Sequence, residues 1–135
     1  MDPRGSSLII LTNLNYVLMI LRDDNPKIPY QNMWGLPGGH VEDNETPKEC
    51  IVREMKEELG LNFKRVKFLF QIKFDYGIKF IFLTRVNKAT LKLNLTEGKG
   101  IKWFKIEDLI KKDNLAYQAK EILEKAHEDF NIGKN

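Results

Sequence analysis

The stretch that decides the fold of this 135-residue chain is residues 34–61, which read WGLPGGHVEDNETPKECIVREMKEELGL. A helix is predicted in its second half, because Thr46 can cap the first turn, Pro47 suits the first helical position and Glu49 can complete a capping box. Gly60 is expected to end the helix. The segment therefore predicts a glycine-rich loop followed by a helix with defined ends.

The predicted helix has two faces of different character. One face carries apolar side chains four residues apart, the spacing of a stripe that packs against a core: Ile51, Met55 and Leu59. The other face carries Glu54, Glu57 and Glu58, which at i, i+3 and i+4 share an arc of about 100°. Like charges at these spacings destabilise a helix by roughly 0.2–0.5 kcal/mol per pair, and Arg53 can neutralise only part of the cluster. We therefore expect a bound cation to neutralise the remaining negative charge of these carboxylates.

The carboxylate face and the glycines before it predict a metal-dependent phosphate site. Carboxylate oxygens suit Mg²⁺, with Mn²⁺ as a substitute, and Mg²⁺ usually completes its shell with water and substrate phosphates. Gly38 and Gly39 let the backbone come close enough to offer a carbonyl oxygen to the same ion. A solvated acidic face is the plain alternative for any Glu-rich helix. The fixed offsets between the capped helix, the carboxylates, the arginine and the glycines favour the metal site.

Residues 34–61 resemble the Nudix box, with Gly39, then Glu45, then REMKEELGL at 53–61. The resemblance implies an α/β fold, the Nudix-type α/β/α sandwich with a mixed sheet. It also implies the residues of a divalent-metal site, which are Glu54, Glu57, Glu58 and the carbonyl of Gly39. Arg53 would orient these carboxylates for catalysis, and Glu45 would brace the loop against the helix.

Glu97 is the candidate for a fourth acid that binds metal. It precedes Trp103, and in MutT-type members of the family an acidic residue in a similar place before such a Trp reaches the metal site from a loop. The alternative is an ordinary turn residue, since loop carboxylates are common. Three carboxylates, those of Glu54, Glu58 and Glu97, are candidates for the group that accepts a proton from the attacking water. We favour Glu54, which adjoins Arg53.

The rest of the chain predicts interleaved strands and helices. β-Prone runs and turn signals indicate strands at 7–12, 16–21, 66–74 and 79–86, with shorter ones at 91–95 and 101–104. Helical spacing returns at 106–111 and 117–130. With no internal repeat, this order indicates one mixed α/β domain over residues 1–135, in which residues 1–6 are expected to be a disordered or vector-derived start.

Composition favours a soluble cytoplasmic protein. Hydrophobic residues make up 42% of the chain and charged residues 30%, a balance that suits a globular domain. Cys50 is the only cysteine, so no intramolecular disulfide can form and a reducing compartment is favoured. We expect its thiol to be buried and inert. The apolar run at 8–21 is interrupted by polar residues and too short for a membrane span.

The resemblance predicts hydrolysis of a pyrophosphate bond in a nucleoside diphosphate derivative. MutT-type enzymes, which cut a nucleoside triphosphate into a monophosphate and pyrophosphate, match the compact length, the lead-in at Trp34 and the place of Glu97. Two features depart from known branches. The chain has no proline after Pro47, unlike the ADP-ribose branch, and it has no clear counterpart of the asparagine with which MutT reads oxidised guanine.

Three other functions remain open. A dinucleoside polyphosphate hydrolase is one, because Tyr76 lies near the position where that branch favours a tyrosine. An RNA 5′-end pyrophosphohydrolase is another, since a formal net charge of +3 helps to attract a polyanion, although a solvated basic surface is the more ordinary explanation. The last is a non-catalytic nucleotide-binding module, which the intact box carboxylates disfavour.

Overall fold

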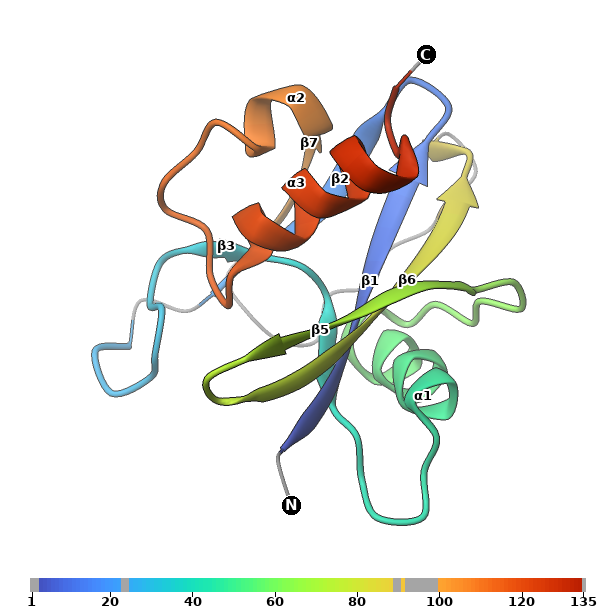
Figure 1. Cartoon of the computed structure of the whole chain (residues 1–135), viewed down its shortest axis with the longest axis vertical. Helices are drawn as coiled ribbons and strands as arrows, with labels where there is room; N and C mark the ends of the chain where they lie inside the picture. The colour runs from blue at the N-terminus through green and yellow to red at the C-terminus, as the bar shows by residue number, and fades with distance from the viewer. Residues whose placement is uncertain (1–2, 23–24, 89–90, 92–99, 135) are drawn as a thin grey trace.

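The computed structural model describes residues 3–22, 25–88, 91 and 100–134 of the chain. The described residues form the following elements (Figure 1): β1 (Arg4–Thr12), β2 (Tyr16–Leu21), β3 (Trp34–Gly35), β4 (Gly38–His40), α1 (Pro47–Leu59), β5 (Lys67–Phe74), β6 (Gly77–Val86), β7 (Gly100–Lys105), α2 (Ile106–Leu109) and α3 (Ala119–Phe130).

β1 is the centre of a mixed sheet. It runs parallel to β6 in unbroken register along its whole length. Its other edge is shared by two antiparallel partners, because residues 5–7 pair with β4 while Leu11 pairs with Val17 of β2. β5 extends the sheet beyond β6, and β3 and β7 both pair with β2. The first strand in the sequence therefore organises strands from the whole chain.

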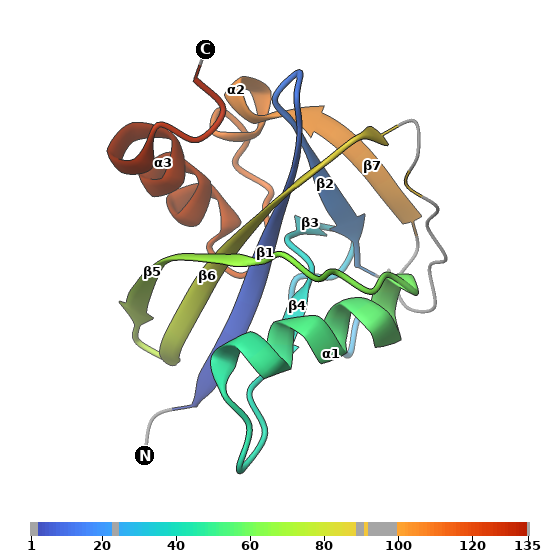
Figure 2. The same cartoon turned by 90° about the vertical axis from the view of Figure 1, so that its right-hand side faces the viewer.

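Helices cover both faces of the sheet. Successive side chains of β1 point to opposite faces, so this strand contributes to the packing on each side. Leu8 and Ile10 pack in the cluster that contains the apolar stripe of α1, whereas Ile9 and Leu11 pack in the cluster formed with α2 and α3. Figure 2 shows α1 on one side of the strands and α3 on the other. This arrangement confirms the predicted α/β/α sandwich.

α1 forms as its sequence predicts. The Thr46 hydroxyl accepts the N–H of Glu49 at 3.1 Å, and the Glu49 carboxylate accepts the N–H of Thr46 at 2.9 Å, which completes the capping box. Gly60 ends the helix with a left-handed φ of 69°. The predicted stripe is fully buried: Ile51, Met55 and Leu59. The glutamate-bearing face is thereby kept out of the core.

The beginning of the chain differs from its prediction. The disordered start expected at residues 1–6 is wrong for residues 4–6, since these belong to β1 and their backbone pairs with β6. The strands β3 and β4 were not predicted, because two and three residues are too few to show an alternating pattern. β3 is held by pairing with β2 and β4 by pairing with β1, and such pairing cannot be recognised from the local sequence.

The C-terminal elements are also shorter than predicted. The helix expected at 117–130 begins only at Ala119, because Tyr117 and Gln118 have left-handed φ angles of 52° and 56°. α2 ends at Leu109, since the following residues turn back through backbone hydrogen bonds. The strand expected at 91–95 lies outside the described residues, apart from Leu91, which is in no strand.

Candidate active site

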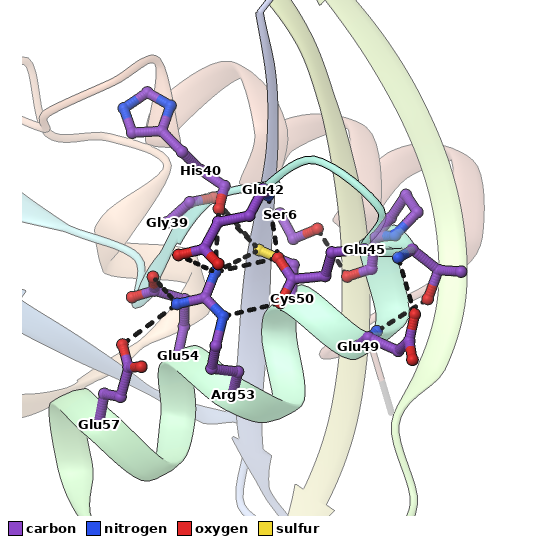
Figure 3. A network of polar contacts seen from close by, with 12 residues as sticks. Ser6, Gly39, His40, Glu42, Glu45, Glu49, Cys50, Arg53, Glu54 and Glu57 are labelled. Carbon is purple, nitrogen blue, oxygen red and sulfur yellow. Dashed lines mark hydrogen bonds and ion pairs between the residues drawn. The ribbon is translucent and has the colours of Figure 1, made fainter.

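Arg53 is the centre of a polar network on the exposed face of α1 (Figure 3). Its Nε and Nη2 donate to the two carboxylate oxygens of Glu45, at 2.7 and 3.0 Å. Its Nη1 donates to Glu54 at 2.9 Å and to Glu57 at 3.1 Å. Nη2 also donates to the backbone carbonyl of His40, at 3.1 Å. One guanidinium thus joins two carboxylates of the helix, Glu54 and Glu57, to the loop that precedes it.

Glu45 anchors Arg53 to that loop. Its Oε1 accepts the backbone N–H of Glu42 at 3.0 Å, in addition to the bonds from Arg53. The hydrogen bonds from the guanidinium, supported by this backbone bond, lower the pKa of Glu45 from 4.5 to about 2. The same bonds raise the pKa of Arg53 above its ordinary value. Glu45 therefore makes the contacts that its predicted bracing role requires.

Gly39 is where the loop approaches the carboxylates most closely. A Cβ added at this position would collide with the carboxylate group of Glu54. Because β4 pairs Gly39 with Ser6 of the central strand, the glycine backbone is fixed by the sheet while α1 presents Glu54 to it. The missing side chain leaves room for the carboxylate beside the backbone.

Two small polar side chains fasten α1 to its surroundings, one to this loop and one to β1. The buried thiol of Cys50 lies 3.3 Å from the carbonyl oxygen of His40 and 3.6 Å from that of Gly39. Burial raises the pKa of the thiol to about 11, so it stays protonated, as the prediction of an inert cysteine requires. The Ser6 hydroxyl donates to the carbonyl of Pro47 at 2.8 Å, which joins β1 to the first turn of α1.

A pocket of about 730 Å³ opens beside the network, with β1 as part of its lining. One end is formed by Gly38, Gly39 and Glu58 and adjoins Glu54 and Glu57 of the Arg53 network; we call these residues together the acidic end. The opposite part, which we call the cationic end, is formed by four side chains: Arg22, Tyr76, Lys79 and Tyr117. The pocket therefore joins the carboxylate face of α1 to a region of positive charge and aromatic rings.

The cationic end is built around Tyr117. Lys79 Nζ donates to the Tyr117 carbonyl at 3.2 Å and lies 4.9 Å from the centre of its ring. The guanidinium carbon of Arg22 lies 4.8 Å from the same ring centre, and the ring of Tyr30 is 4.6 Å away. Our sequence reasoning missed Lys79 and Arg22. The available signal was a lysine within the otherwise apolar run IKFIFL at 78–83.

Comparison with known proteins bears on the identity of this site. The sequence model of the NUDIX domain family matches residues 2–126 of this chain. The chain belongs to the Nudix family. It is 37% identical over 67 residues to an 8-oxo-dGTP diphosphatase of Proteus vulgaris, which covers 50% of the chain and 60% of that protein. It is 32% identical over 121 residues to an ADP-ribose pyrophosphatase of Methanocaldococcus jannaschii, which covers 84% of the chain and 67% of that protein.

The Nudix fold is also shared with a solved structure. The crystal structure of a MutT protein from Methanosarcina mazei superposes with a TM-score of 0.82 at 22% identity, covering 95% of this chain and 94% of that one. The chain spans about two thirds or less of the length of the first curated relatives it matches. The family and the fold follow from these matches.

The Nudix box residues suit a divalent metal through their chemistry. Hard carboxylate oxygens gather on α1, and the bare Gly39 backbone lies against one of them. Among the described residues, no three His, Cys, Asp or Glu side chains are grouped tightly enough to hold an ion by themselves. Arg53 draws Glu54 and Glu57 to itself, whereas Glu58 lines the pocket. The donor set fits a metal that also takes oxygens from water and substrate.

The remaining predicted residues of this Nudix chain have different outcomes. Glu97 lies outside the described residues. Trp103 packs against the core on the α1 side. The side chain of His40 is exposed, and its carbonyl makes the contact with Arg53. None of the helices in the described residues combines the length and the apolar character that a membrane crossing requires.

Proposed function

We propose that this Nudix protein is a pyrophosphohydrolase that cuts a nucleoside triphosphate into a nucleoside monophosphate and pyrophosphate. The observation that carries the proposal is the Arg53 network, which holds Glu54 and Glu57 beside a pocket lined by Glu58. A concave pocket on which titratable side chains converge is the usual first candidate for an active site. We expect it to act in the cytoplasm.

The cofactor of the proposed reaction is Mg²⁺, with Mn²⁺ as a substitute. Its ligands would be the side chains of Glu54, Glu57, Glu58 and Glu97 and the carbonyl of Gly39. When bound, the metal would neutralise charge that develops on the phosphate oxygens and make bound water more acidic. Arg53 and Glu45 support this proposal, because their hydrogen bonds fix the carboxylates before any ligand enters.

The residues of the chain would supply the remaining chemistry. A water molecule attacks phosphorus, the bond from that phosphorus to the bridging oxygen breaks, and a carboxylate accepts the proton of the water. Glu54 is the favoured acceptor, because it is fixed both by Arg53 at 2.9 Å and by its contact with Gly39. Glu58 and Glu97 are the other candidates.

The substrate class is supported by what the relatives share. The names of the two curated relatives described above refer to an oxidised nucleoside triphosphate and to ADP-ribose, both of which contain a pyrophosphate bond. The triphosphate is favoured by the sequence features that resemble MutT. A dinucleoside polyphosphate remains the second candidate, because Tyr76 lines the pocket. An RNA 5′ end is favoured only by the net charge.

Product identification tests the proposal. The protein is incubated with Mg²⁺ and a panel of nucleoside triphosphates, ADP-ribose, dinucleoside polyphosphates and 5′-triphosphorylated RNA, and the products are separated. We expect monophosphate and pyrophosphate from a triphosphate. If water attacks the β-phosphorus, turnover in ¹⁸O-water places the label in pyrophosphate, whereas attack at the α-phosphorus labels the monophosphate. Rapid cleavage of another panel member beside negligible triphosphate cleavage would reject the substrate.

A further inference from the structure

Lys79 belongs to the cationic end of the pocket and lies on β6. In the sheet, Gly5 of β1 pairs with Lys79 on one side and with His40 on the other. Since adjacent strands are about 4.8 Å apart, Lys79 lies roughly 10 Å across the sheet from the glycine strand β4. Gly5 leaves the space between them free of a side chain. A ligand whose phosphates lie at the acidic end can therefore extend over Gly5 to Lys79.

Lys79 has no carboxylate partner within the part of the chain that the structure describes. Its ammonium group donates to the Tyr117 carbonyl and lies near the rings of Tyr117 and Tyr76, at 4.9 and 5.8 Å from their centres. Among the described residues, no carboxylate lies within ion-pair distance of it. Burial lowers the pKa of Lys79 to about 8. A partly buried charge without a counter-charge destabilises a fold, which suggests that its partner comes with a ligand.

The segment above Lys79 is held in an unfavourable backbone conformation. Tyr117 and Gln118 are consecutive non-glycine residues with left-handed φ angles, and Tyr30, whose ring contacts Tyr117, has a φ of 54°. Residues in such conformations cluster at ligand sites, where the surrounding structure holds them. Here Gln118 is held by the Tyr76 hydroxyl, which donates to its Oε1 at 2.6 Å. The cationic end is thus shaped in advance.

The chemistry of this end specifies what it can bind. Lysine and arginine side chains donate hydrogen bonds and accept none. Lys79 and Arg22 therefore require acceptors on the ligand. A purine with an oxo group at C6 offers two adjacent acceptors, O6 and N7, whereas adenine places an amino donor beside its N7. The amino group of adenine would therefore place a hydrogen-bond donor against the donors of Lys79 and Arg22.

We infer that Lys79 selects the base of the substrate and favours 6-oxopurines over adenine, with Arg22 and Tyr117 shaping its surroundings. The inference rests on the proposed function, because it assumes that the phosphates of the same nucleotide occupy the acidic end.

The test compares inosine 5′-triphosphate with ATP, which differ in carrying an oxo or an amino group at C6. We expect wild-type kcat/KM to be about tenfold or more higher for the inosine nucleotide, since a site that hydrogen-bonds one group rejects its mismatch strongly. Lys79→Met should remove most of that preference by lowering turnover of the inosine nucleotide, leaving ATP within about twofold of wild type. Lys67→Met, at an exposed lysine of β5 outside this pocket, should leave the preference unchanged.

Two results would overturn the inference. An equal loss for both nucleotides in Lys79→Met would mean that Lys79 binds the phosphate chain they share. An unchanged preference would mean that Lys79 does not face the base. Thermal unfolding guards against a folding defect, because removing an unpaired buried charge should leave Tm equal or higher. Lys79→Arg, which keeps a donor-only cation, should retain the direction of the preference.

A binding measurement separates this inference from the proposed function. Calorimetry without metal compares IMP with AMP, and tighter binding of IMP that is lost in Lys79→Met supports the inference whatever bond the enzyme cuts. Tighter IMP binding without triphosphate hydrolysis would reject the proposed function alone. Triphosphate hydrolysis with equal binding of IMP and AMP would reject the inference alone.

Discussion

The two ends of the pocket hold their charges in opposite ways. At the acidic end, Glu54 and Glu57 are already paired with Arg53, which Glu45 fixes in turn. At the cationic end, Lys79 is partly buried and has no carboxylate partner among the described residues. The carboxylates of the acidic end are thus stabilised by contacts within the protein, whereas Lys79 has no such counter-charge in the described part of the chain and is inferred to gain one from a ligand.

The largest expected effect tests the acidic end directly. Glu58→Gln should lower Mg²⁺-supported turnover by about 100-fold or more, the scale on which losing one preorganised charge-stabilising group slows an enzyme. The fold should persist, because the side chain lies on the face of α1 away from the core. Steady-state rates at saturating Mg²⁺ provide the measurement, with Glu124→Gln on the exposed face of α3 as the control. Wild-type turnover in Glu58→Gln would reject its role as a ligand.

A smaller effect tests whether the pairing around Arg53 matters. Glu45→Gln weakens the two hydrogen bonds that anchor the guanidinium, so kcat should fall about tenfold, as when an outer partner of a metal ligand is lost. Glu42→Gln is the matched control, because Glu42 is mostly exposed and its oxygen lies 3.6 Å from Arg53 Nη2. If both substitutions reduce kcat equally, the brace is not specific to Glu45.

Glu97 decides whether the acidic end has a fourth carboxylate. Glu97→Gln should lower kcat more than it raises KM if the residue acts mainly in the transition state, with a loss of up to about tenfold. Initial rates over a range of substrate concentrations separate the two constants. An unchanged kcat would return Glu97 to the role of an ordinary turn residue.

The pH dependence of stability should differ most subtly between the ends. The pKa of Lys79 is lowered from 10.5 to about 8, so the unfolded chain binds the proton more tightly. Its destabilising contribution is therefore fully present below pH 8 and disappears as the pH rises toward 10.5. Denaturant unfolding of wild type and Lys79→Met should give a difference in stability that shrinks across this window. A constant difference would mean that the charge of Lys79 has little energetic effect.

Glu45 should behave in the opposite sense. Because its pKa is about 2 in the folded protein and 4.5 ordinarily, its stabilising contribution is fully present above pH 4.5 and is lost as the pH falls toward 2. The advantage of wild type over Glu45→Gln should decline through that acid window in urea unfolding. An advantage that persists at pH 2 would show that the ion pair with Arg53 is not its source.

The same contrast explains what the sequence could predict. The acidic end comes from residues 39–58, where caps, helical spacing and glycines are local features, and the capping box and the buried stripe of α1 were predicted correctly. The cationic end joins Arg22, Lys79 and Tyr117 from distant parts of the chain. No local pattern marks such residues, since strand register and loop conformation bring them together.

Backbone conformation accounts for the other errors. The helical spacing at 117–130 correctly indicates α3, but it cannot show that Tyr117 and Gln118 adopt left-handed angles before the helix begins. Residues 4–6 carry too little apolar character to predict a strand, although β6 and β4 pair with them. In both cases long-range contacts overrode the local signal.

The position of β1 has a consequence for how the protein folds during synthesis. β1 is the central strand of the sheet, and it leaves the ribosome well before its full-length partner β6, which ends at Val86. The apolar side chains of β1 therefore remain without this partner until β6 has been made. Contacts of such sequence separation slow folding and leave early strands exposed to aggregation. We expect nascent chains that stop before β6 to depend on chaperones.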